Sequence, residues 1–309
     1  MTWLVFVGLG VVVIAASVLL GWSVDLLAQR TGIGRVWMGA FVLAAATSMP
    51  ELLTDLTAVQ IGAGDLAAGD LFGSNLANML ILALASLSFP ARNALRLAAP
   101  ENAGVGALAI GLTALAGAAL LVRPTPSSWP VGIESVAIAL LYVVASPMLA
   151  RRAGEGVEAT APRRLARPLV GVLISALAIL LSAPAFAQAA ERLAEETGLG
   201  RTAVGTVLLG FATSLPELAS TVTALRLNAV DLAVGNLLGS NAFNMLIFPV
   251  LDLADGGGPL FNALDPRHAQ TAFLAVVAMA SALFLLVLRR GESWVVVVVY
   301  AIAVWVVLR

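Results

Sequence analysis

Long apolar runs alternate with short polar breaks along the whole chain. Each run approaches the roughly 20 residues that a helix needs to cross a bilayer, and Gly, Pro or charged residues mark the breaks. The pattern predicts an all-α membrane protein with ten transmembrane helices. The expected spans are 3–29, 34–59, 65–88, 100–122, 130–150, 168–190, 200–226, 230–251, 269–288 and 292–309.

A hydrophilic segment divides the ten predicted helices into two sets of five. This segment, 151–167, carries five arginines and two glutamates and is too short to form a folded domain. We therefore expect a first five-helix unit at 1–150, a linker at 151–167 and a second five-helix unit at 168–309. Because no positively charged segment precedes the first apolar run, we expect that run to be a retained helix and not a signal peptide.

Composition agrees with a membrane protein and excludes several other classes. Hydrophobic residues make up 60% of the 309 and charged residues 11%, whereas soluble proteins carry roughly 25% charged residues. The absence of cysteine excludes disulfides and thiolate chemistry. The single histidine, His268, argues against a dedicated zinc or copper site, and nothing in the charge pattern indicates nucleic-acid binding.

The distribution of arginine predicts how the chain lies in the cell membrane. All 17 basic residues are arginines, and twelve of them fall in loops on one side when successive loops are placed on alternate sides. The positive-inside rule makes that side cytoplasmic. The linker 151–167 is then cytoplasmic, and both termini are external.

An internal repeat is the clearest feature of the sequence. Residues 31–82 align without a gap on residues 197–248, at a constant offset of 166 and with 27 identities in 52 positions. Each repeat belongs to a unit with an odd number of helices, so we expect the second copy to enter the membrane in the opposite orientation. Inverted repeats of this kind build a binding site near the bilayer midplane.

The first motif that both copies of the repeat share places an acidic residue inside an apolar run. The motif Ala-Thr-Ser-x-Pro-Glu ends at Glu51 in one copy and at Glu217 in the other. A charged residue at the bilayer centre costs about 2.5–3.5 kcal/mol on insertion scales, so such a residue indicates function. Pro50 and Pro216 free backbone carbonyls in the preceding turn, which is tolerated at that depth only inside protein or beside a cavity.

The second motif, Gly-Ser-Asn-x-x-Asn, adds neutral oxygen donors. Ser74 with Asn78, and Ser240 with Asn244, are four residues apart and share a helix face. Carboxylates, hydroxyls, amides and freed carbonyls are the hard oxygen ligands that suit calcium or sodium. Small residues at a spacing of four also predict close helix packing at Gly69 with Gly73 and at Gly235 with Gly239.

The two motifs together resemble the alpha-repeats of the calcium/cation antiporter superfamily, specifically its sodium/calcium exchanger branch. The resemblance implies a secondary active antiporter that exchanges sodium for calcium by alternating access, with no enzymatic activity and no cofactor. The expected partners are calcium and sodium ions and membrane lipid, and the chain is expected to act as a monomer. Members of this family slide their first and sixth helices across the remaining core.

The resemblance also implies a role for each residue of the motifs. The two glutamates coordinate calcium and sodium, the threonine carbonyls complete the calcium site, and the serines and asparagines line adjacent sodium sites. The positions that match the family pattern are Thr47, Ser48, Glu51, Ser74 and Asn78, with Thr213, Ser214, Glu217, Ser240 and Asn244.

The chain departs from the family pattern at two positions. Many sodium/calcium exchangers have aspartate where this chain has Asn244, and asparagine is usual where this chain has Asp70. Asp70 lies one turn before Ser74, so we expect it to replace part of the missing charge in a vestibule. The other intramembrane acids, Asp25, Asp55 and Glu134, are expected to lie near helix ends or in contact with solvent.

Three other functions compete with sodium/calcium exchange. A calcium/proton antiporter would use the same two glutamates, and the sequence leaves this alternative open. A cation channel would need a continuous path with weak sites. An intramembrane enzyme would use the glutamates as an acid/base pair, but nothing in the sequence resembles an intramembrane aspartyl protease motif.

Overall fold

The computed structural model describes residues 2–154, 164–197 and 213–307, and in these residues it is helical without any strand. Six helices are long and apolar enough to cross a membrane, which makes this a multi-pass membrane protein. They are α1 (Thr2–Thr31), α5 (Gly64–Ser88), α7 (Glu101–Val122), α9 (Ala166–Glu196), α12 (Val230–Asp255) and α14 (His268–Val287). Two shorter apolar helices are α8 (Ile133–Gly154) and α15 (Trp294–Val307), and three short turns are η2 (Pro90–Arg92), α6 (Ala94–Leu97) and α13 (Leu260–Ala263).

A seventh apolar span is broken in the middle. It consists of α2 (Arg35–Trp37), the π-helix η1 (Met38–Leu43), α3 (Ala44–Thr47) and α4 (Met49–Gln60), with a bend of 44° between its two halves. The break falls at Ser48, whose ψ of 3° is not helical, because Pro50 cannot donate the next helical hydrogen bond.

The second repeat has the same break at the same place. Its α11 (Leu215–Arg226) starts after Ser214, whose ψ is 7°. Helix α11 begins and ends 166 residues after α4 begins and ends, which is the offset between the repeats. The first half of the helix expected at 200–226 lies outside the described residues.

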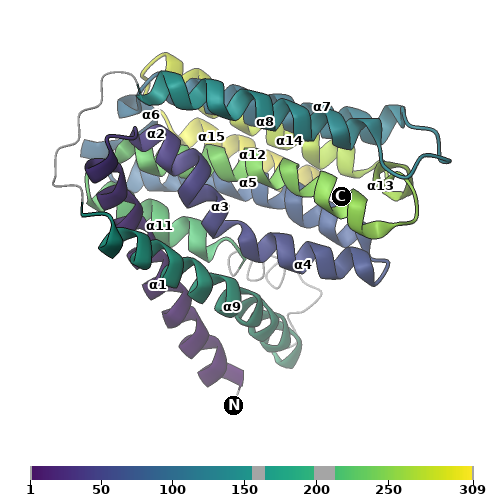
Figure 1. Ribbon diagram of the computed structural model, residues 1–309, viewed down its shortest axis with the longest axis horizontal. Coiled ribbons are helices and arrows are strands. Elements are labelled where there is room, and N and C mark those ends of the chain that lie inside the picture. The colour runs from purple at the N-terminus through teal and green to yellow at the C-terminus, as the bar shows by residue number, and fades with distance from the viewer. Residues whose placement is uncertain (1, 155–163, 198–212, 308–309) are drawn as a thin grey trace.

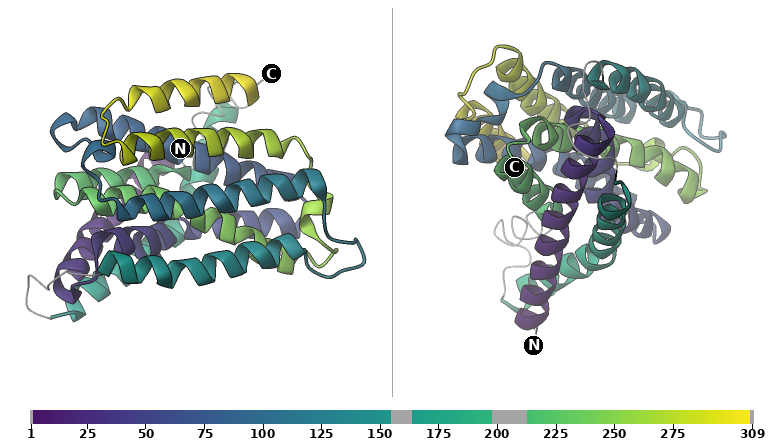
Figure 2. Two further views of the ribbon diagram at one scale, coloured as in Figure 1. Left: turned by 90° about the horizontal axis from the view of Figure 1, so that it is seen from above. Right: turned by 60° about the vertical axis from the view of Figure 1, so that its left-hand side comes forward.

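The repeats meet in a core built around α5 and α12 (Figures 1 and 2). Phe72 on α5, Phe248 on α12 and Phe261 on α13 are fully buried and stack in sequence, with ring centroids 5.2 and 5.0 Å apart. Gly235 and Gly239 allow the backbone of η1 to lie directly on α12. A Cβ atom at Gly235 would come within 2.7 Å of the Val36 carbonyl, so the close packing predicted for Gly235 with Gly239 is confirmed. The same prediction is wrong for Gly73, where a Cβ atom would meet nothing within 4 Å.

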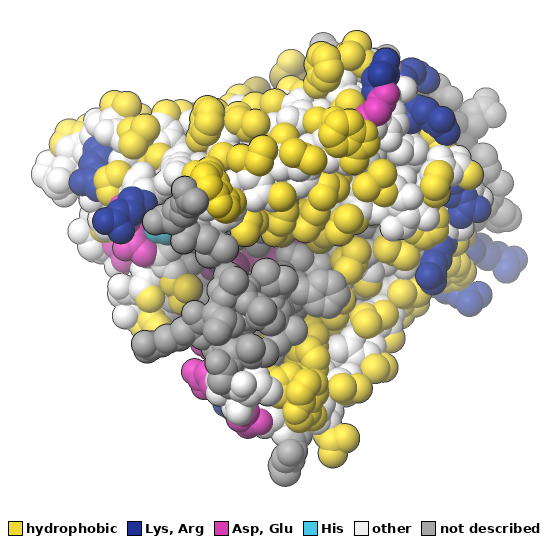
Figure 3. Space-filling view, turned by 180° about the vertical axis from the view of Figure 1, so that it is seen from behind, with side chains coloured by type: hydrophobic (Ala, Val, Ile, Leu, Met, Phe, Trp, Pro, Cys, Tyr) yellow, Lys and Arg dark blue, Asp and Glu magenta, His cyan; other side chains and the backbone are white. Residues whose placement is uncertain are grey.

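The bundle has two distinct ends. At one end Arg92 donates to the carbonyls of Leu225 and Arg226, at 3.0 and 3.3 Å. At the opposite end the carboxylate of Asp65 accepts from the backbone N–H of Asp265. Basic side chains gather over the first end on the face shown in Figure 3, and the surface between the ends is mainly hydrophobic.

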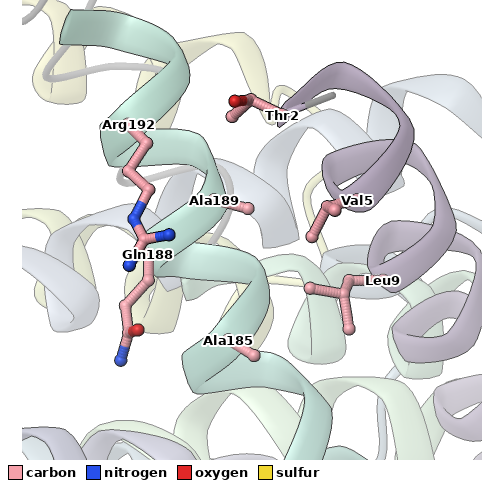
Figure 4. Close-up of a pocket in the computed structure, with 7 residues that line it drawn as sticks. All are labelled: Thr2, Val5, Leu9, Ala185, Gln188, Ala189 and Arg192. Carbon is pink, nitrogen blue, oxygen red and sulfur yellow. The ribbon is translucent and has the colours of Figure 1, made fainter.

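Helices α1 and α9 pack along one another and lie obliquely across the other helices (Figure 1). The pair covers the site-bearing helices, since α1 contacts α11 and α9 contacts α4. Gly21 of α1 faces the backbone carbonyl of Ser220 on α11. A cavity of about 330 Å³ separates α1 from α9 near the N-terminus (Figure 4), and none of the candidate site residues lines it.

Candidate cation site

The two glutamates occupy equivalent positions in the two repeats. Each lies in the first turn after the helix break, Glu51 in α4 and Glu217 in α11. Both side chains are buried, with 5% and 2% of their surface exposed. The first turn of a helix carries partial positive charge, which favours a carboxylate there.

The first motif of one repeat contacts the glutamate of the other. The hydroxyl of Ser48 donates to Oε1 of Glu217 at 3.3 Å. The neighbouring Thr47 is fully buried, and its hydroxyl donates to the Ala44 carbonyl at 3.2 Å. The carboxylates of Glu51 and Glu217 are close enough to repel each other. The structure thus brings together residues that are 169 positions apart in the sequence.

The second motif forms a reciprocal network of amides between α5 and α12. The amide of Asn75 donates to the backbone carbonyl of Asn241 at 3.2 Å, and that of Asn241 donates to the carbonyl of Asn75 at 3.1 Å. The amide of Asn78 donates to Oδ1 of Asn241 at 2.9 Å, and that of Asn244 to Oδ1 of Asn75 at 3.1 Å. The four bonds obey the internal symmetry and hold α5 against α12.

This network leaves oxygen acceptors without donors. Five buried oxygen atoms at the candidate positions have no hydrogen-bond partner: Oε2 of Glu51, Oε2 of Glu217, Oδ1 of Asn78, Oδ1 of Asn244 and Oγ of Ser240. Buried polar atoms are normally satisfied. Because the amide N–H groups are already engaged, the atoms left over are hard oxygen ligands, which is the donor set that calcium and sodium require.

The remaining candidates lie beside these residues. Ser74 on α5 and Ser214 at the start of α11 are buried. Thr213 lines a small cavity together with Glu51. Among the described residues, no group of three or more His, Cys, Asp or Glu side chains is arranged to hold a metal ion, so a cation here depends on two carboxylates and neutral oxygens.

Asn75 and Asn241 were not predicted as individual site residues. Both belong to the repeated Gly-Ser-Asn-x-x-Asn motif, and their identity at equivalent positions was the available signal. They are fully buried and orient the two asparagines that follow them.

The outlying acids were expected near helix ends or in contact with solvent, and the structure contradicts the contact with solvent. Asp25 is buried in α1 and bonds to Arg35 at 2.7 Å. Glu134 lies near the start of α8 as expected, but it is buried and accepts from the hydroxyl of Thr125. Asp55 is also buried, in a helix that packs against α5, α12 and α9.

Comparison with known proteins agrees with this architecture. The family model described as "Sodium/calcium exchanger protein" matches residues 1–148 and 167–309. The inner membrane protein YrbG of Escherichia coli is 31% identical over 260 residues, which cover 80% of this chain and 77% of that protein. The sodium/calcium exchanger MaX1 of Methanosarcina acetivorans is 34% identical over 150 residues, 46% of this chain and 41% of that protein.

A solved structure shares the fold. The sodium-calcium exchanger NCX_Mj, soaked with 100 mM Na⁺ and 10 mM Sr²⁺, superposes with a TM-score of 0.76 at 21% identity and covers 98% of this chain and 97% of its own. With the family model matching nearly the whole length, this chain belongs to the sodium/calcium exchanger family of membrane transporters, which move sodium and calcium without enzymatic activity or a cofactor.

Proposed function

We propose that this protein exchanges sodium for calcium by alternating access, with Glu51 and Glu217 as the central ligands. The observation that carries the proposal is the pair of repeat-related buried carboxylates surrounded by oxygen atoms that lack donors. Two carboxylates balance the two charges of calcium. The same oxygens suit sodium, which would occupy them when calcium leaves.

The proposal includes the whole set of candidate residues and the predicted arrangement in the membrane. Thr47, Ser48, Ser74 and Asn78 extend the ligand set around Glu51, and Thr213, Ser214, Ser240 and Asn244 extend it around Glu217. Ten spans form two inverted five-helix units at 1–150 and 168–309, with the linker 151–167 cytoplasmic and both termini external. A single copy of the chain contains all of these ligands, which is consistent with a monomeric transporter.

Alternating access requires one part of the molecule to move past another. Helices α1 and α9 are suited to this motion, because they pack along each other and cross the site-bearing helices at an oblique angle (Figure 1). At Gly21, α1 lies close to α11, because a Cβ atom there would be 3.3 Å from the Ser220 carbonyl. In contrast, the reciprocal amide network ties α5 to α12, and these two helices form the fixed part of the site.

Calcium-45 uptake into proteoliposomes tests the proposal. Vesicles containing the purified protein are loaded with sodium and diluted into sodium-free buffer, and a parallel set carries an outward proton gradient instead. We expect uptake with the sodium gradient and little uptake with the proton gradient. Uptake driven only by protons would replace this proposal with calcium/proton exchange, and uptake without any coupling gradient would indicate a channel.

A further inference from the structure

Thr113 lies on α7, outside the aligned segment of the first repeat, and connects this helix to the amide network of the site. The side chain is fully buried, and its hydroxyl donates to the backbone carbonyl of Ala109 at 2.8 Å. A hydroxyl has a single proton, so the oxygen of Thr113 can meet a further partner only as an acceptor. That partner is the side-chain amide of Asn75, which donates to it at 3.1 Å.

The amide of Asn75 can therefore lie in one orientation only. Of its two N–H groups, one donates to Thr113 and the other to the backbone carbonyl of Asn241 at 3.2 Å. Its Oδ1 is left to accept from the side-chain amide of Asn244, at 3.1 Å. Asn244 thus turns its nitrogen toward Asn75, and its own Oδ1 is a buried atom without a donor.

The second half of the molecule has no counterpart of Thr113. The ends of α14 lie within one residue of the positions 166 after the ends of α7, and at this offset Thr113 corresponds to Met279. Met279 is fully buried, and a thioether donates no hydrogen bond and accepts only weakly. In the part of the chain that the structure describes, the side-chain amide of Asn241 donates only to the carbonyl of Asn75.

The two asparagines that hold the network are consequently held differently. The side chain of Asn75 makes three hydrogen bonds, whereas that of Asn241 makes two. The additional bond comes from Thr113. Of the two asparagines with an unpartnered Oδ1, Asn244 is therefore the one whose orientation is fixed from α7, and Asn78 is not.

We propose that Thr113 is a positioning residue of the cation site, which acts through Asn75 to direct Oδ1 of Asn244 toward the ion. Each step of this connection is a hydrogen bond between buried side chains. An ionised aspartate at position 244 could not donate to Oδ1 of Asn75, so the network fits the asparagine that this chain has there. The role of Thr113 rests on the proposed function, in which Asn244 is a ligand.

Substitutions at residue 113 test this role through the calcium affinity, measured by equilibrium binding of calcium-45 to the purified full-length protein. Thr113→Val removes the hydroxyl and nearly retains the shape, and we expect a loss of affinity of about three- to tenfold, the range of one hydrogen bond. Thr113→Ser retains the hydroxyl and should bind calcium within about twofold of the natural protein. Met279→Leu, at the equivalent position of the other half, should leave the affinity unchanged.

Double substitutions distinguish positioning from packing. In a protein that carries Asn244→Ala, the oxygen that Thr113 directs is absent, so adding Thr113→Val should cause no further loss of calcium affinity. In a protein that carries Asn78→Ala, the same addition should cause the full loss, because Asn78 bonds to Asn241 and not to Asn75. Thermal unfolding of every variant checks the fold, and Thr113→Ala replaces the valine variant if the latter does not fold.

Two results would overturn the positioning role. One is a folded Thr113→Val protein with the calcium affinity of the natural protein. The other is an equal loss with and without Asn244→Ala, which would make Thr113 a packing residue. Failure of the proposed function would appear instead in the natural protein, as calcium uptake driven by protons alone. The calcium affinities would still test Thr113 in that case, because a calcium/proton antiporter would use the same site.

Discussion

Replacing Glu51 or Glu217 with glutamine removes one of the two charges that would face a calcium ion in the proposed site, while the side chain keeps its size and one oxygen. Both residues are almost fully buried, so an effective dielectric near 20 applies and two unit charges about 4 Å apart interact by about 4 kcal/mol. Calcium carries two charges. Loss of one carboxylate therefore removes up to about 8 kcal/mol of attraction for calcium and about half of that for sodium.

Part of this loss is offset. The desolvation cost of burying a carboxylate is absent in the variant, and the amide oxygen can still coordinate the ion. If about half of the lost attraction is not offset, the binding free energy weakens by about 4 kcal/mol for calcium and by about 2 kcal/mol for sodium. These changes correspond to a roughly thousand-fold and a roughly 30-fold loss of affinity. Equilibrium binding of calcium-45 and sodium-22 to each purified variant measures both quantities. Thermal unfolding of the same samples checks that the fold is intact.

A matched control is Glu134→Gln, which neutralises another buried glutamate that bonds to Thr125 outside the site. Its calcium affinity should stay within about threefold of the natural value, under 1 kcal/mol. The charge argument is refuted if both central variants also stay within that range. It is equally refuted if calcium and sodium affinities fall by the same factor, because charge predicts the larger loss for calcium.

Three other substitutions test separate features. Gly239→Ala places a Cβ atom against the Ala40 backbone and should destabilise the fold by about 1–3 kcal/mol in thermal unfolding, whereas Gly111→Ala, with open space around it, should not. Asn244→Asp adds a titratable acid to the site, so calcium affinity should weaken in acid relative to the natural protein; superimposable affinities between about pH 5 and pH 9 would place residue 244 outside the site. Gly154→Cys should resist an impermeant thiol reagent applied to intact cells, and labelling from outside would reverse the proposed orientation.

The apolar runs in the sequence predicted the positions of most helices correctly. The expected spans 65–88, 100–122 and 269–288 each agree within a residue with α5, α7 and α14. The reason is that the hydrophobic pattern changes sharply where these helices end. The break at Ser48 also followed from Pro50, because the loss of an N–H acts locally.

Features that depend on contacts between distant segments were not predictable in this way. The π-helix η1 lies directly on the glycines of α12, and nothing within its own six residues indicates this partner. Asp55 was expected near a helix end or in contact with solvent, but it is buried in α4, which packs against α5, α12 and α9. The amide network likewise requires knowledge of which helices meet, although repetition of the motif pointed to its members.

The reciprocal bonds between Asn75 and Asn241 have the form of an isologous interface. In a two-fold symmetric dimer, residue i of one subunit contacts residue j of the other, and j contacts i in return. Here Asn75 and Asn241 exchange amide-to-carbonyl bonds. The amides of the following asparagines donate in the same reciprocal way, Asn78 to Oδ1 of Asn241 and Asn244 to Oδ1 of Asn75. The fused chain thus preserves within one polypeptide the contact by which two half-length copies would dimerise, and the cation site lies at what would be their subunit boundary.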